Sequence, residues 1–516
     1  MHRSLLQTLI VTILSVGLYS CASIDFDYPR QESTAFTDTG DTYLGRKIEP
    51  AVAELPAGEA GFFPRPDGID ALAARLLLAA RAERSIDVQY YLIKNDIVGR
   101  AFIHALLQAA DRGVRVRLLL DDVFTKGYDE GMAALDAHPN FEIRIFNPIG
   151  RSGGRALNAM TSFSRINRRM HNKSFTVDNQ ITIVGGRNIA DEYFGAREDA
   201  KFGDLDVVGV GPVVRDVSAM FDSYWQHETA LPIAAFAKMP DDPARVLDEF
   251  RKRLEATRGE VIQSEYTDAV RQKVLAFVDG GQSLFISAPY ALAYDSPDKG
   301  IKSRAAEADS ITTPLRESLT SAREQITLIS PYFVPRKNGV EALIGIRERG
   351  VDVTVITNSL AANNQFTVHG GYAPVRKPLL KNNIRIYEVR PDADVAGAEI
   401  VAASGAKATL HTKAFIVDRR EVFIGSFNFD PRSANINTEL GVIIRSPALA
   451  ETFLQQIEAN LPRQTYAVFL DQKGKLRWRG IDRDGTEVIY TKEPETSWGQ
   501  RFMAGLMRLM PIRGQL

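Results

Sequence analysis

Two copies of a His-x-Lys-x-x-x-x-Asp motif are the part of this sequence best suited to chemistry. The copies consist of His171, Lys173 and Asp178, and of His411, Lys413 and Asp418. Each copy follows a β-strand pattern, in which residues two apart point to the same face, so each places an imidazole beside an ammonium group. Two such strands brought together would form a phosphodiester pocket with a histidine on either side.

The residue types suggest how such a pocket would react. One imidazole can attack phosphorus to form a phosphohistidine, while the opposite one protonates the leaving alkoxide and later deprotonates the incoming alcohol or water. Lys173 and Lys413 would stabilise charge on the non-bridging oxygens, with Asn188 and Asn428 as neutral donors. This chemistry requires no metal, and the sequence predicts neither a metal nor a cofactor.

A histidine in this role needs an acceptor on its other ring nitrogen, to fix the tautomer and support the cation. The second copy offers Glu439, and the first offers Asp204 or Asp206. Asp204 is preferred because it lies eight residues before Pro212, just as Glu439 lies eight before Pro447.

The expected site therefore has two groups of side chains that face each other. They are His171, Lys173, Asn188 and Asp204 on one side, and His411, Lys413, Asn428 and Glu439 on the other. The motif aspartates, Asp178 and Asp418, complete the set of candidate catalytic residues, although we expect them to bind locally and shape their loops.

Helix and strand patterns alternate through the chain, which predicts an α/β fold with a mostly parallel sheet. The order occurs twice: Arg112-Gly113-Val114 returns as Arg349-Gly350-Val351, and Gly185 and Asn188 return as Gly425 and Asn428. Two diverged copies of one α/β unit are therefore predicted.

The composition changes along the chain predict six segments. They are a lipoprotein-type signal or membrane anchor (1–21), a flexible tether (22–60), a first domain (61–230), a helical connector or insertion (231–285), a second domain (286–465) and a tail (466–516). In the tail, Phe502, Leu506 and Leu509 share one helical face. An interfacial membrane helix and a helix docked on the protein's own surface both fit this pattern.

The N-terminal leader indicates a membrane location. An apolar stretch, 5–18, follows Arg3 and ends shortly before Cys21, the only cysteine of the chain. This resembles a bacterial lipoprotein signal, in which Cys21 becomes lipidated. Tyr19 stands where such signals usually have a small residue, so an uncleaved anchor is the alternative. Either way, we expect the protein at a membrane of a bacterial cell envelope.

Charge argues against a nucleic-acid partner, because the net charge is −1 and the pI near 6.7, with no interleaving of aromatic and basic residues. One local basic stretch precedes the first motif: Arg151, Arg155, Arg165, Arg168 and Arg169. It either meets a lipid phosphate or forms a solvated loop face.

Further motifs carry a resemblance to a known family. They include 87–91 (DVQYY), 185–188 (GGRN), 330–335 (SPYFVP), 357–363 (TNSLAAN) and 425–433 (GSFNFDPRS). From about Gly61 to its end the chain resembles the phospholipase D superfamily, and more closely the C-type bacterial cardiolipin synthases. The resemblance implies duplicated α/β sandwich domains with pseudo-twofold symmetry and one active site at their interface. It also implies that His171 is the nucleophile and His411 the acid/base.

One residue departs from the family pattern. The superfamily usually has serine after the motif glycine; Ser426 keeps it, but Gly186 does not. The two halves of the site therefore need not be equivalent.

The resemblance implies transfer of a phosphatidyl group to phosphatidylglycerol, which gives cardiolipin. The donor is phosphatidylglycerol, phosphatidylethanolamine or both, so phospholipids and a membrane surface are the expected partners. A phospholipase D that uses water as the acceptor has the same motif, since acceptor choice depends on water exclusion. A nuclease is disfavoured by the charge, and a non-catalytic lipid-binding lipoprotein by the completeness of both motifs.

Overall fold

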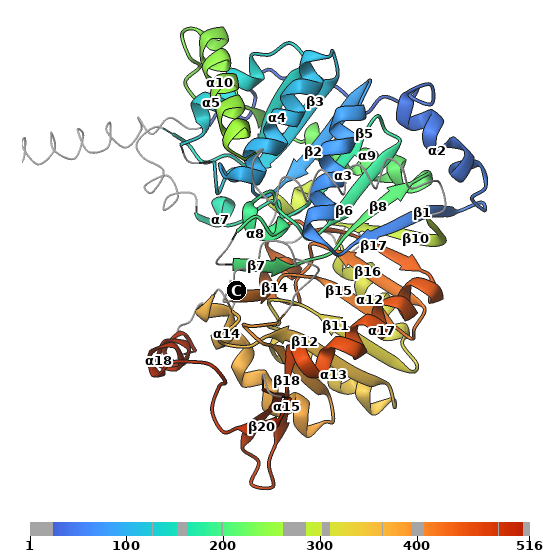
Figure 1. The fold of residues 1–516 in the computed structure, drawn as a ribbon, viewed down its shortest axis with the longest axis vertical. Helices are drawn as coiled ribbons and strands as arrows, with labels where there is room; N and C mark the ends of the chain where they lie inside the picture. Colours follow the sequence, from blue (N-terminus) through green and yellow to red (C-terminus); the bar gives the residue numbers. More distant parts are fainter. Residues whose placement is uncertain are drawn as a thin grey trace, which may run out of the picture.

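The structure is a computed structural model that describes residues 24–125, 127–151, 163–197, 200–261, 285–301, 310–363, 365–393, 407–482 and 485–508. Two α/β halves of similar build stand one above the other (Figure 1). The predicted leader, Arg155 and Leu509 lie outside the described residues.

The strands of the first half are β1 (Glu59–Arg65), β2 (Ser85–Tyr90), β3 (Arg115–Asp121), β4 (Phe141–Phe146), β5 (Ser174–Val177), β6 (Ile181–Gly185), β7 (Ala200–Gly203), β8 (Asp206–Val210) and β9 (Ala230–Pro232). Its helices are α2 (Tyr43–Ala53), α3 (Gly68–Arg81), α4 (Ile97–Asp111), α5 (Asp129–Asp136), α7 (Phe163–Ile166), α8 (Asp191–Phe194), α9 (Pro212–Trp225), η1 (Ile233–Ala235) and α10 (Pro243–Val261).

The strands of the second half are β10 (Ile286–Tyr294), β11 (Gln325–Ile329), β12 (Asp352–Asn358), β13 (Arg385–Val389), β14 (Lys407–Leu410), β15 (Ala414–Val417), β16 (Glu421–Gly425), β17 (Leu440–Arg445), β18 (Thr465–Leu470), β19 (Leu476–Ile481) and β20 (Glu487–Tyr490). Its helices are η2 (Pro297–Gly300), α12 (Thr312–Ser321), α13 (Arg336–Glu348), α14 (Phe366–Tyr372), η4 (Ala373–Val375), α15 (Arg376–Lys381), α16 (Pro431–Asn435), α17 (Pro447–Gln464) and α18 (Trp498–Met507).

One sheet runs through both halves and has a palindromic order. The strands of the first half follow each other as β9-β4-β3-β2-β5-β6-β8-β1. The second half continues as β10-β17-β16-β15-β11-β12-β13-β18, with β19 and β20 at the far edge. The halves join where β1 pairs antiparallel with β10. This order confirms the predicted duplication and places a pseudo-twofold axis at the β1/β10 pair.

The expectation of a mostly parallel sheet is wrong. Only β2-β3-β4 and β11-β12-β13 pair in parallel within the described part of this sheet, while the motif strands run antiparallel to their neighbours. The physical reason is the tight turn after each motif: Asp178 and Asn179 have φ of 51° and 50°, and Asp418 and Arg419 of 50° and 54°. A turn with positive φ returns the chain as a hairpin rather than through a crossover helix.

The repeated Arg-Gly-Val tripeptide marks the end of a helix in each half. Helices α4 and α13 are capped by Arg112 and Arg349, and the following Gly113 and Gly350 have φ of 94° and 93°. This left-handed conformation suits glycine because a Cβ atom would be strained there. The tripeptide therefore ends a helix and starts the next strand, which is why it recurs.

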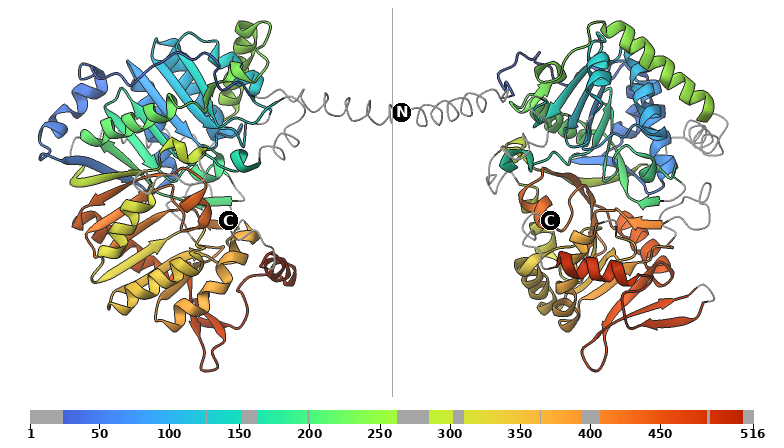
Figure 2. Two further views of the ribbon diagram at one scale, coloured as in Figure 1. Left: turned by 180° about the vertical axis from the view of Figure 1, so that it is seen from behind. Right: turned by 90° about the vertical axis from the view of Figure 1, so that its left-hand side faces the viewer.

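Helices cover both faces of the sheet (Figure 2). Alternate residues of the central strands enter different cores: Ile183 packs with α3 and α4, whereas its neighbour Val184 packs with α9. The core beneath α9 also contains Leu449 and Leu454 of α17 from the second half. The two halves therefore share one apolar core, which fixes them relative to each other.

The start of the chain differs from the expected tether. Instead of extending freely, residues from 24 onward lie along the first half, and 43–53 form α2. Arg117 donates to the Ser33 carbonyl at 2.8 Å, and the Trp225 indole donates to Ser33 Oγ at 3.0 Å. Buried arginines of the sheet thus find acceptors in this segment, which the polar composition did not reveal.

Among the residues described, no helix is both long and apolar enough to cross a membrane.

Candidate active site

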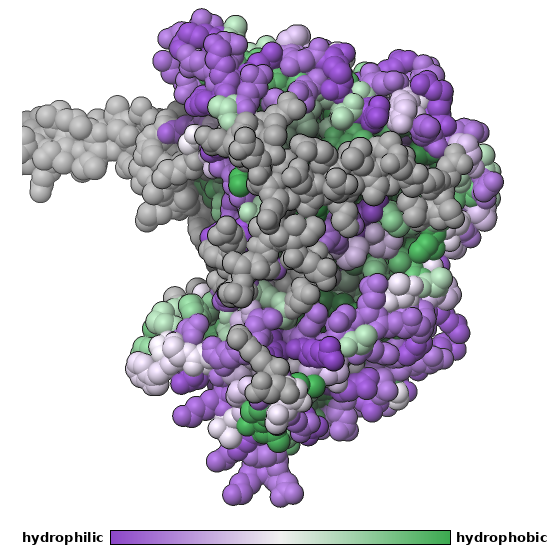
Figure 3. Space-filling view, viewed as in Figure 1, coloured by the Kyte–Doolittle hydropathy of each residue, from purple (hydrophilic) through white to green (hydrophobic). Residues whose placement is uncertain are grey.

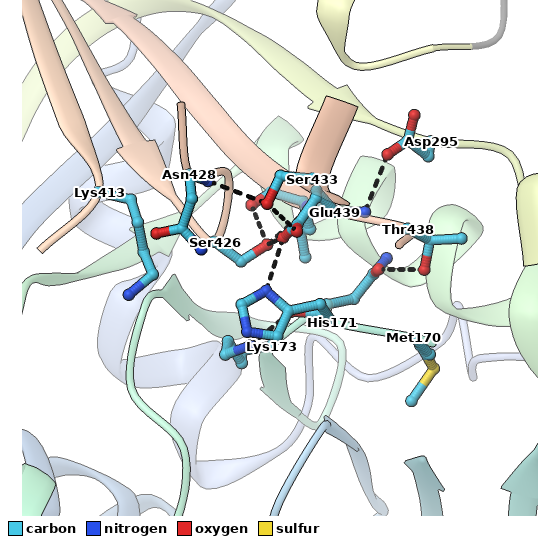
Figure 4. A network of polar contacts seen from close by, with 12 residues as sticks. Met170, His171, Lys173, Asp295, Lys413, Ser426, Asn428, Ser433, Thr438 and Glu439 are labelled. Carbon is cyan, nitrogen blue, oxygen red and sulfur yellow. Dashed lines mark hydrogen bonds and ion pairs between the residues drawn. The ribbon is translucent and has the colours of Figure 1, made fainter. Parts of the chain in front are cut away.

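The two histidine motifs meet at the interface between the halves. Figure 4 shows Lys413 of the second motif on the same side of the pocket as His171 and Lys173 of the first. His171 and His411 lie just before strands β5 and β15. Their exposed fractions are 9% and 6%, and those of Lys173 and Lys413 are 1% each. Such nearly complete burial is unusual for these residue types and marks a functional pocket.

His171 is held by a carboxylate of the other half. Its Nδ1 lies 2.8 Å from Oε2 of Glu439. The Glu439 carboxylate also accepts hydrogen bonds from Ser426 Oγ at 2.5 Å and Ser433 Oγ at 2.7 Å. Its backbone N–H donates to Asp295 at 2.9 Å. Glu439 is therefore fully buried and fixed, and it leaves Nε2 of His171 to face a substrate.

His411 has the matching arrangement with a carboxylate of the first half. Its Nδ1 lies 2.5 Å from Oδ2 of Asp204. The other oxygen of Asp204 accepts from the backbone N–H of Leu205 at 2.8 Å. Lys413 Nζ lies against the His411 ring, 3.1 Å from Nε2. His411 is therefore a second imidazole with a fixed tautomer, and the Lys413 ammonium lies next to it.

The pairing of histidines with carboxylates is therefore crossed, and the expectation of pairs within each half is wrong. Strand β7 pairs in parallel with β14, which sets Gly203 opposite Leu410 and Asp204 beside His411. The equivalent bridge joins Met170 to Thr438. Each segment that carries a carboxylate thus crosses the interface and hydrogen-bonds to the chain just before the other half's histidine.

The motif aspartates do not belong to the pocket. Asp178 accepts backbone N–H groups of Arg84 at 2.7 Å and Ser85 at 2.9 Å, and Asp418 accepts those of Glu324 at 2.8 Å and Gln325 at 3.0 Å. Since they lie at the far ends of β5 and β15, about 20 Å of extended chain separates them from the histidines. As expected, they bind locally, and they anchor the starts of β2 and β11.

Asp206, the alternative to Asp204, serves another purpose. Its carboxylate pairs with Arg75 at 2.8 Å and Arg187 at 3.3 Å, and its side chain is 1% exposed. It neutralises buried arginines beside the site and does not bind a histidine.

Asn188 and Asn428 are buried, and each has a side-chain amide oxygen without a hydrogen-bond partner in the described part of the chain. Asn188 Nδ2 donates to the Tyr193 hydroxyl at 2.9 Å, and the Tyr193 ring contacts the His411 ring edge-on at 4.9 Å. Because buried polar atoms are normally satisfied, the amides of Asn188 and Asn428 are available to a ligand. Rotating either amide would present its NH2 group to a phosphate oxygen.

Burial and neighbouring charge set the protonation states. Burial lowers the pKa of His171 to about 4 and, together with Lys413, that of His411 to about 3. Burial likewise lowers the pKa of Lys173 to about 7 and of Lys413 to about 8. Without substrate, both imidazoles are therefore neutral at pH 7. A phosphodiester anion would raise the pKa of all four groups, because it favours their charged forms.

Both carboxylates stay ionised despite their burial. Burial raises the pKa of Asp204, but Lys413 and His411 outweigh this and leave it below its ordinary value. The same balance, with His171 and Lys173 as the main opposing charges, lowers the pKa of Glu439. An ionised carboxylate is what stabilises an imidazolium during proton transfer.

Gly186 stands where the family usually has serine, and the shorter side chain of Asp204, compared with Glu439, explains this difference. A Cβ atom on Gly186 would lie 2.3 Å from Oδ1 of Asp204, so no side chain fits there. In the second half Glu439 is one methylene longer and leaves room for Ser426, which donates to it. The pairs Gly186 with Asp204 and Ser426 with Glu439 are two solutions to the same packing problem.

We expect Ser426→Ala to lower kcat about tenfold, because one hydrogen bond to a buried carboxylate is lost. Gly186→Ala should lower kcat more, since its methyl group displaces Asp204 from His411. Steady-state rates with each variant check this, and thermal unfolding controls for the fold. A Gly186→Ala enzyme as active as Ser426→Ala would contradict the packing argument.

The described arginines of the basic stretch bind protein groups, which the sequence pattern did not predict. Arg151 pairs with Asp122 at 2.7 Å and Asp129 at 2.8 Å. Arg169 is 1% exposed and donates to the Asn147 carbonyl at 3.2 Å. Arg165 and Arg168 bind carbonyl oxygens of neighbouring segments. These side chains organise the loop that leads into His171.

Sequence reasoning did not assign roles to Ser433, Asp295, Tyr91 or Tyr193. Ser433 lies in the 425–433 motif, so its conspicuous sequence context was the available signal. The Tyr91 ring contacts the His171 ring at 5.0 Å, in a similar way to Tyr193 on His411. Asp295 belongs to no motif, and only the tertiary structure brings it to the Glu439 backbone.

Comparisons with known proteins identify the family of this chain. The family model described as "Cardiolipin synthase, PLD-like domain" matches residues 76–225 and 315–461, which contain one motif each. Cardiolipin synthase C of Escherichia coli (strain K12) is 41% identical over 484 residues, which are 91% of this chain and 98% of that protein. A cardiolipin synthase of Alkalihalophilus pseudofirmus is 26% identical over 73% of this chain and 61% of its own length.

Among solved structures, the phosphatidylserine synthase of Haemophilus influenzae Rd KW20 aligns with a TM-score of 0.55. The alignment covers 82% of this chain and 91% of that one at 13% identity, and so supports the fold. The family model matches both halves, and the identity of 41% extends over 91% of the chain. The chain belongs to the phospholipase D superfamily, as an enzyme of its cardiolipin synthase family.

Proposed function

We propose that the protein transfers a phosphatidyl group from a donor phospholipid to phosphatidylglycerol, through a phosphohistidine, and so forms cardiolipin. The observation that carries the proposal is the crossed pair of buried histidines, His171 on Glu439 and His411 on Asp204. Each has its Nδ1 beside a carboxylate. Nε2 of His171 is then left for one side of a phosphodiester, and Nε2 of His411, which lies beside Lys413 Nζ, for the other.

In the first step, Nε2 of His171 forms a bond to phosphorus while the bond to the donor's headgroup oxygen breaks. His411, protonated after the anionic substrate binds, gives its proton to the departing alkoxide. In the second step, His411 takes a proton from a hydroxyl of phosphatidylglycerol, whose oxygen attacks phosphorus and breaks the P–N bond. Lys173 and Lys413 stabilise the non-bridging oxygens in both steps.

Phosphatidylglycerol is preferred over water as the acceptor on two grounds. The similar proteins are named cardiolipin synthases, including one that matches 91% of this chain. The histidines are also 9% exposed or less, so little bulk water reaches a phosphohistidine there.

Incubating purified protein with phosphatidylglycerol vesicles, with and without phosphatidylethanolamine, and resolving the lipids tests the proposal. Cardiolipin together with the released donor headgroup, glycerol or ethanolamine, is the expected result, and the headgroup identifies the donor. Phosphatidic acid without cardiolipin would instead show that water is the acceptor. Unchanged lipids would overturn the enzyme function itself.

Helix α18 supports a membrane-facing role. It begins at Ser497 with a capping box, in which Ser497 and Gln500 each bind the other's backbone N–H. Ala504 is buried, and the chain at Met507 packs closely on Gly370 of α14. The opposite side exposes large apolar side chains: Trp498 (73%), Phe502 (55%), Met503 (38%) and Leu506 (44%). The helix is therefore docked on the protein and still presents an apolar face (Figure 3).

We expect that face to enter the lipid interface, where tryptophan and other large apolar side chains are favoured. Trp225 and Trp478 are 0% and 4% exposed, so Trp498 is the tryptophan that lipid can reach. Brominated phosphatidylglycerol vesicles should quench its fluorescence, and the quenching should disappear in Trp498→Phe. Equal quenching in that variant would exclude α18 from the bilayer surface.

Anchoring at Cys21 is proposed on the leader's sequence pattern, 1–21. If Cys21 is lipidated, cells should incorporate labelled palmitate into the wild-type protein but not into Cys21→Ser. Label in both proteins, or in neither, would reject the lipoprotein assignment.

A further inference from the structure

A mostly apolar cavity of about 220 Å³ lies in the first half, between the sheet and helix α10, and its lining also includes the charged residues Lys94, Arg100 and Arg253. Leu118 and Leu120 of β3 and Leu135 of α5 form one wall, while Val246, Phe250 and Leu254 of α10 form the other. Leu118, Leu135, Val246 and Leu254 are all less than 5% exposed. Helix α10 belongs to the segment that connects the two halves, so this cavity has a wall that the duplicated unit itself does not supply.

The cavity adjoins the catalytic pocket through Tyr91. Tyr91 lines the cavity, and the edge-on contact of its ring with His171 has a centroid distance of 5.0 Å. Asp121 lines it as well and accepts the backbone N–H of Met170, the residue before His171, at 2.9 Å. A molecule whose phosphorus lies at His171 therefore has this cavity within reach.

Aromatic side chains stand at the opening. Phe124 and Tyr128, in the loop after β3, line the cavity and are 45% and 36% exposed. Phe124 also contacts the Tyr91 ring at 5.4 Å. Large apolar side chains that remain exposed beside a pocket usually mark a place where an apolar ligand enters.

We infer that this cavity holds an acyl chain of the phosphatidyl group that becomes attached to His171. The inference rests on the proposed function and adds the site that recognises the lipid part of the substrate. The departing headgroups, glycerol and ethanolamine, are small and polar, whereas the facing walls of β3, α5 and α10 are apolar and favour hydrocarbon. The acyl chain stays attached to the phosphatidyl phosphorus through both steps. The cavity therefore keeps it bound while the departing headgroup is replaced by the hydroxyl of phosphatidylglycerol.

Gly131 provides a way to fill the cavity. It lies in α5 and lines the cavity, and a Cβ atom built on it has no heavy atom within 4 Å. Gly345 in α13 is also a helical glycine with open space around its Cβ position, and it does not line the cavity. Phenylalanine has a better helix propensity than glycine, so neither substitution should weaken its helix.

The test compares dihexanoyl phosphatidylglycerol, as monomers, with its deacylated form, glycerophosphoglycerol. The wild-type protein should show a higher kcat/KM for the acylated substrate. Gly131→Phe should reduce the ratio of the two kcat/KM values about tenfold, equivalent to lost burial of roughly two methylene groups. Gly345→Phe should leave the ratio as it is. An unaltered ratio in a folded Gly131→Phe protein would overturn the inference.

Photolabelling of the unmodified protein gives a second readout. Phosphatidylglycerol with a diazirine at the end of one acyl chain should label peptides of α5 or α10. Label found only on α18 or elsewhere on the surface would overturn the inference even if turnover is normal. A wild-type protein that acts on none of these phosphodiesters would refute the proposed function instead, so the two failures are distinguishable.

Discussion

His171→Ala is expected to reduce phosphatidyl transfer by roughly four to six orders of magnitude, because no other group can form the covalent intermediate. His411→Ala should cause a comparable loss with natural donors, whose alkoxide leaving groups require a proton. Lipid turnover measured on vesicles gives both rates. Cooperative thermal unfolding of each variant shows that the loss is chemical and not a failure to fold.

A donor with a p-nitrophenolate leaving group separates the two histidines. This leaving group departs without protonation, so His411→Ala should still release one equivalent of nitrophenol per site in a burst. His171→Ala should show no burst. The reverse pattern would assign the nucleophile to His411, and substantial turnover in either alanine variant would contradict a two-histidine mechanism.

Glu439→Gln and Asp204→Asn should each lower kcat by about two to four orders of magnitude. An amide keeps much of the shape but no longer stabilises an imidazolium or fixes its tautomer. The crossed arrangement makes the target of each substitution specific. Glu439→Gln should act on His171, 2.8 Å away, and Asp204→Asn on His411, 2.5 Å away.

Nitrogen-15 NMR of histidine-labelled protein tests these assignments, with the two alanine variants identifying the signals. Glu439 raises the pKa of His171. Its removal should therefore lower that pKa below about 4 and keep the ring neutral to more acidic pH. Glu439→Gln should leave the His411 signals in place. If Glu439→Gln changed only the His411 signals, Glu439 would pair with the histidine of its own half, and this result would contradict the crossed site.

The sequence was a good guide where local chemistry determines the structure. The Arg-Gly-Val repeat predicted the duplication, and it recurs because a left-handed residue after a helix favours glycine in any context. The two motifs predicted a shared pocket, because each strand brings a histidine and a lysine to one face. Duplication then predicted the pseudo-twofold arrangement that the sheet order confirms.

The crossed carboxylates show what local spacing cannot provide. The distances from Asp204 to Pro212 and from Glu439 to Pro447 identified the correct residues, because both lie before equivalent strand and helix units. Spacing along the chain does not say that these segments pass across the interface. That depends on the β7/β14 pairing, which joins residues 200–203 to 407–410 and forms only after the halves assemble.

The basic stretch illustrates a second limit. A run of arginines has the same sequence pattern whether it meets lipid, water or buried acceptors. Arg169 satisfies its charge on Asp121 and the Asn147 carbonyl, which are 48 and 22 residues away in the chain. Such partners are supplied by the tertiary fold, and so the stretch could not be assigned from composition alone.

Trapping the intermediate tests the central claim most directly. Protein mixed with phosphatidylglycerol that carries a phosphorus-32 label, then denatured within one turnover at alkaline pH, should retain label on the peptide that contains His171. Glycerophosphoglycerol serves as the matched substrate without acyl chains. The account predicts label at His171 and none in His171→Ala. Label at His411, or active turnover without any labelled histidine, would contradict it.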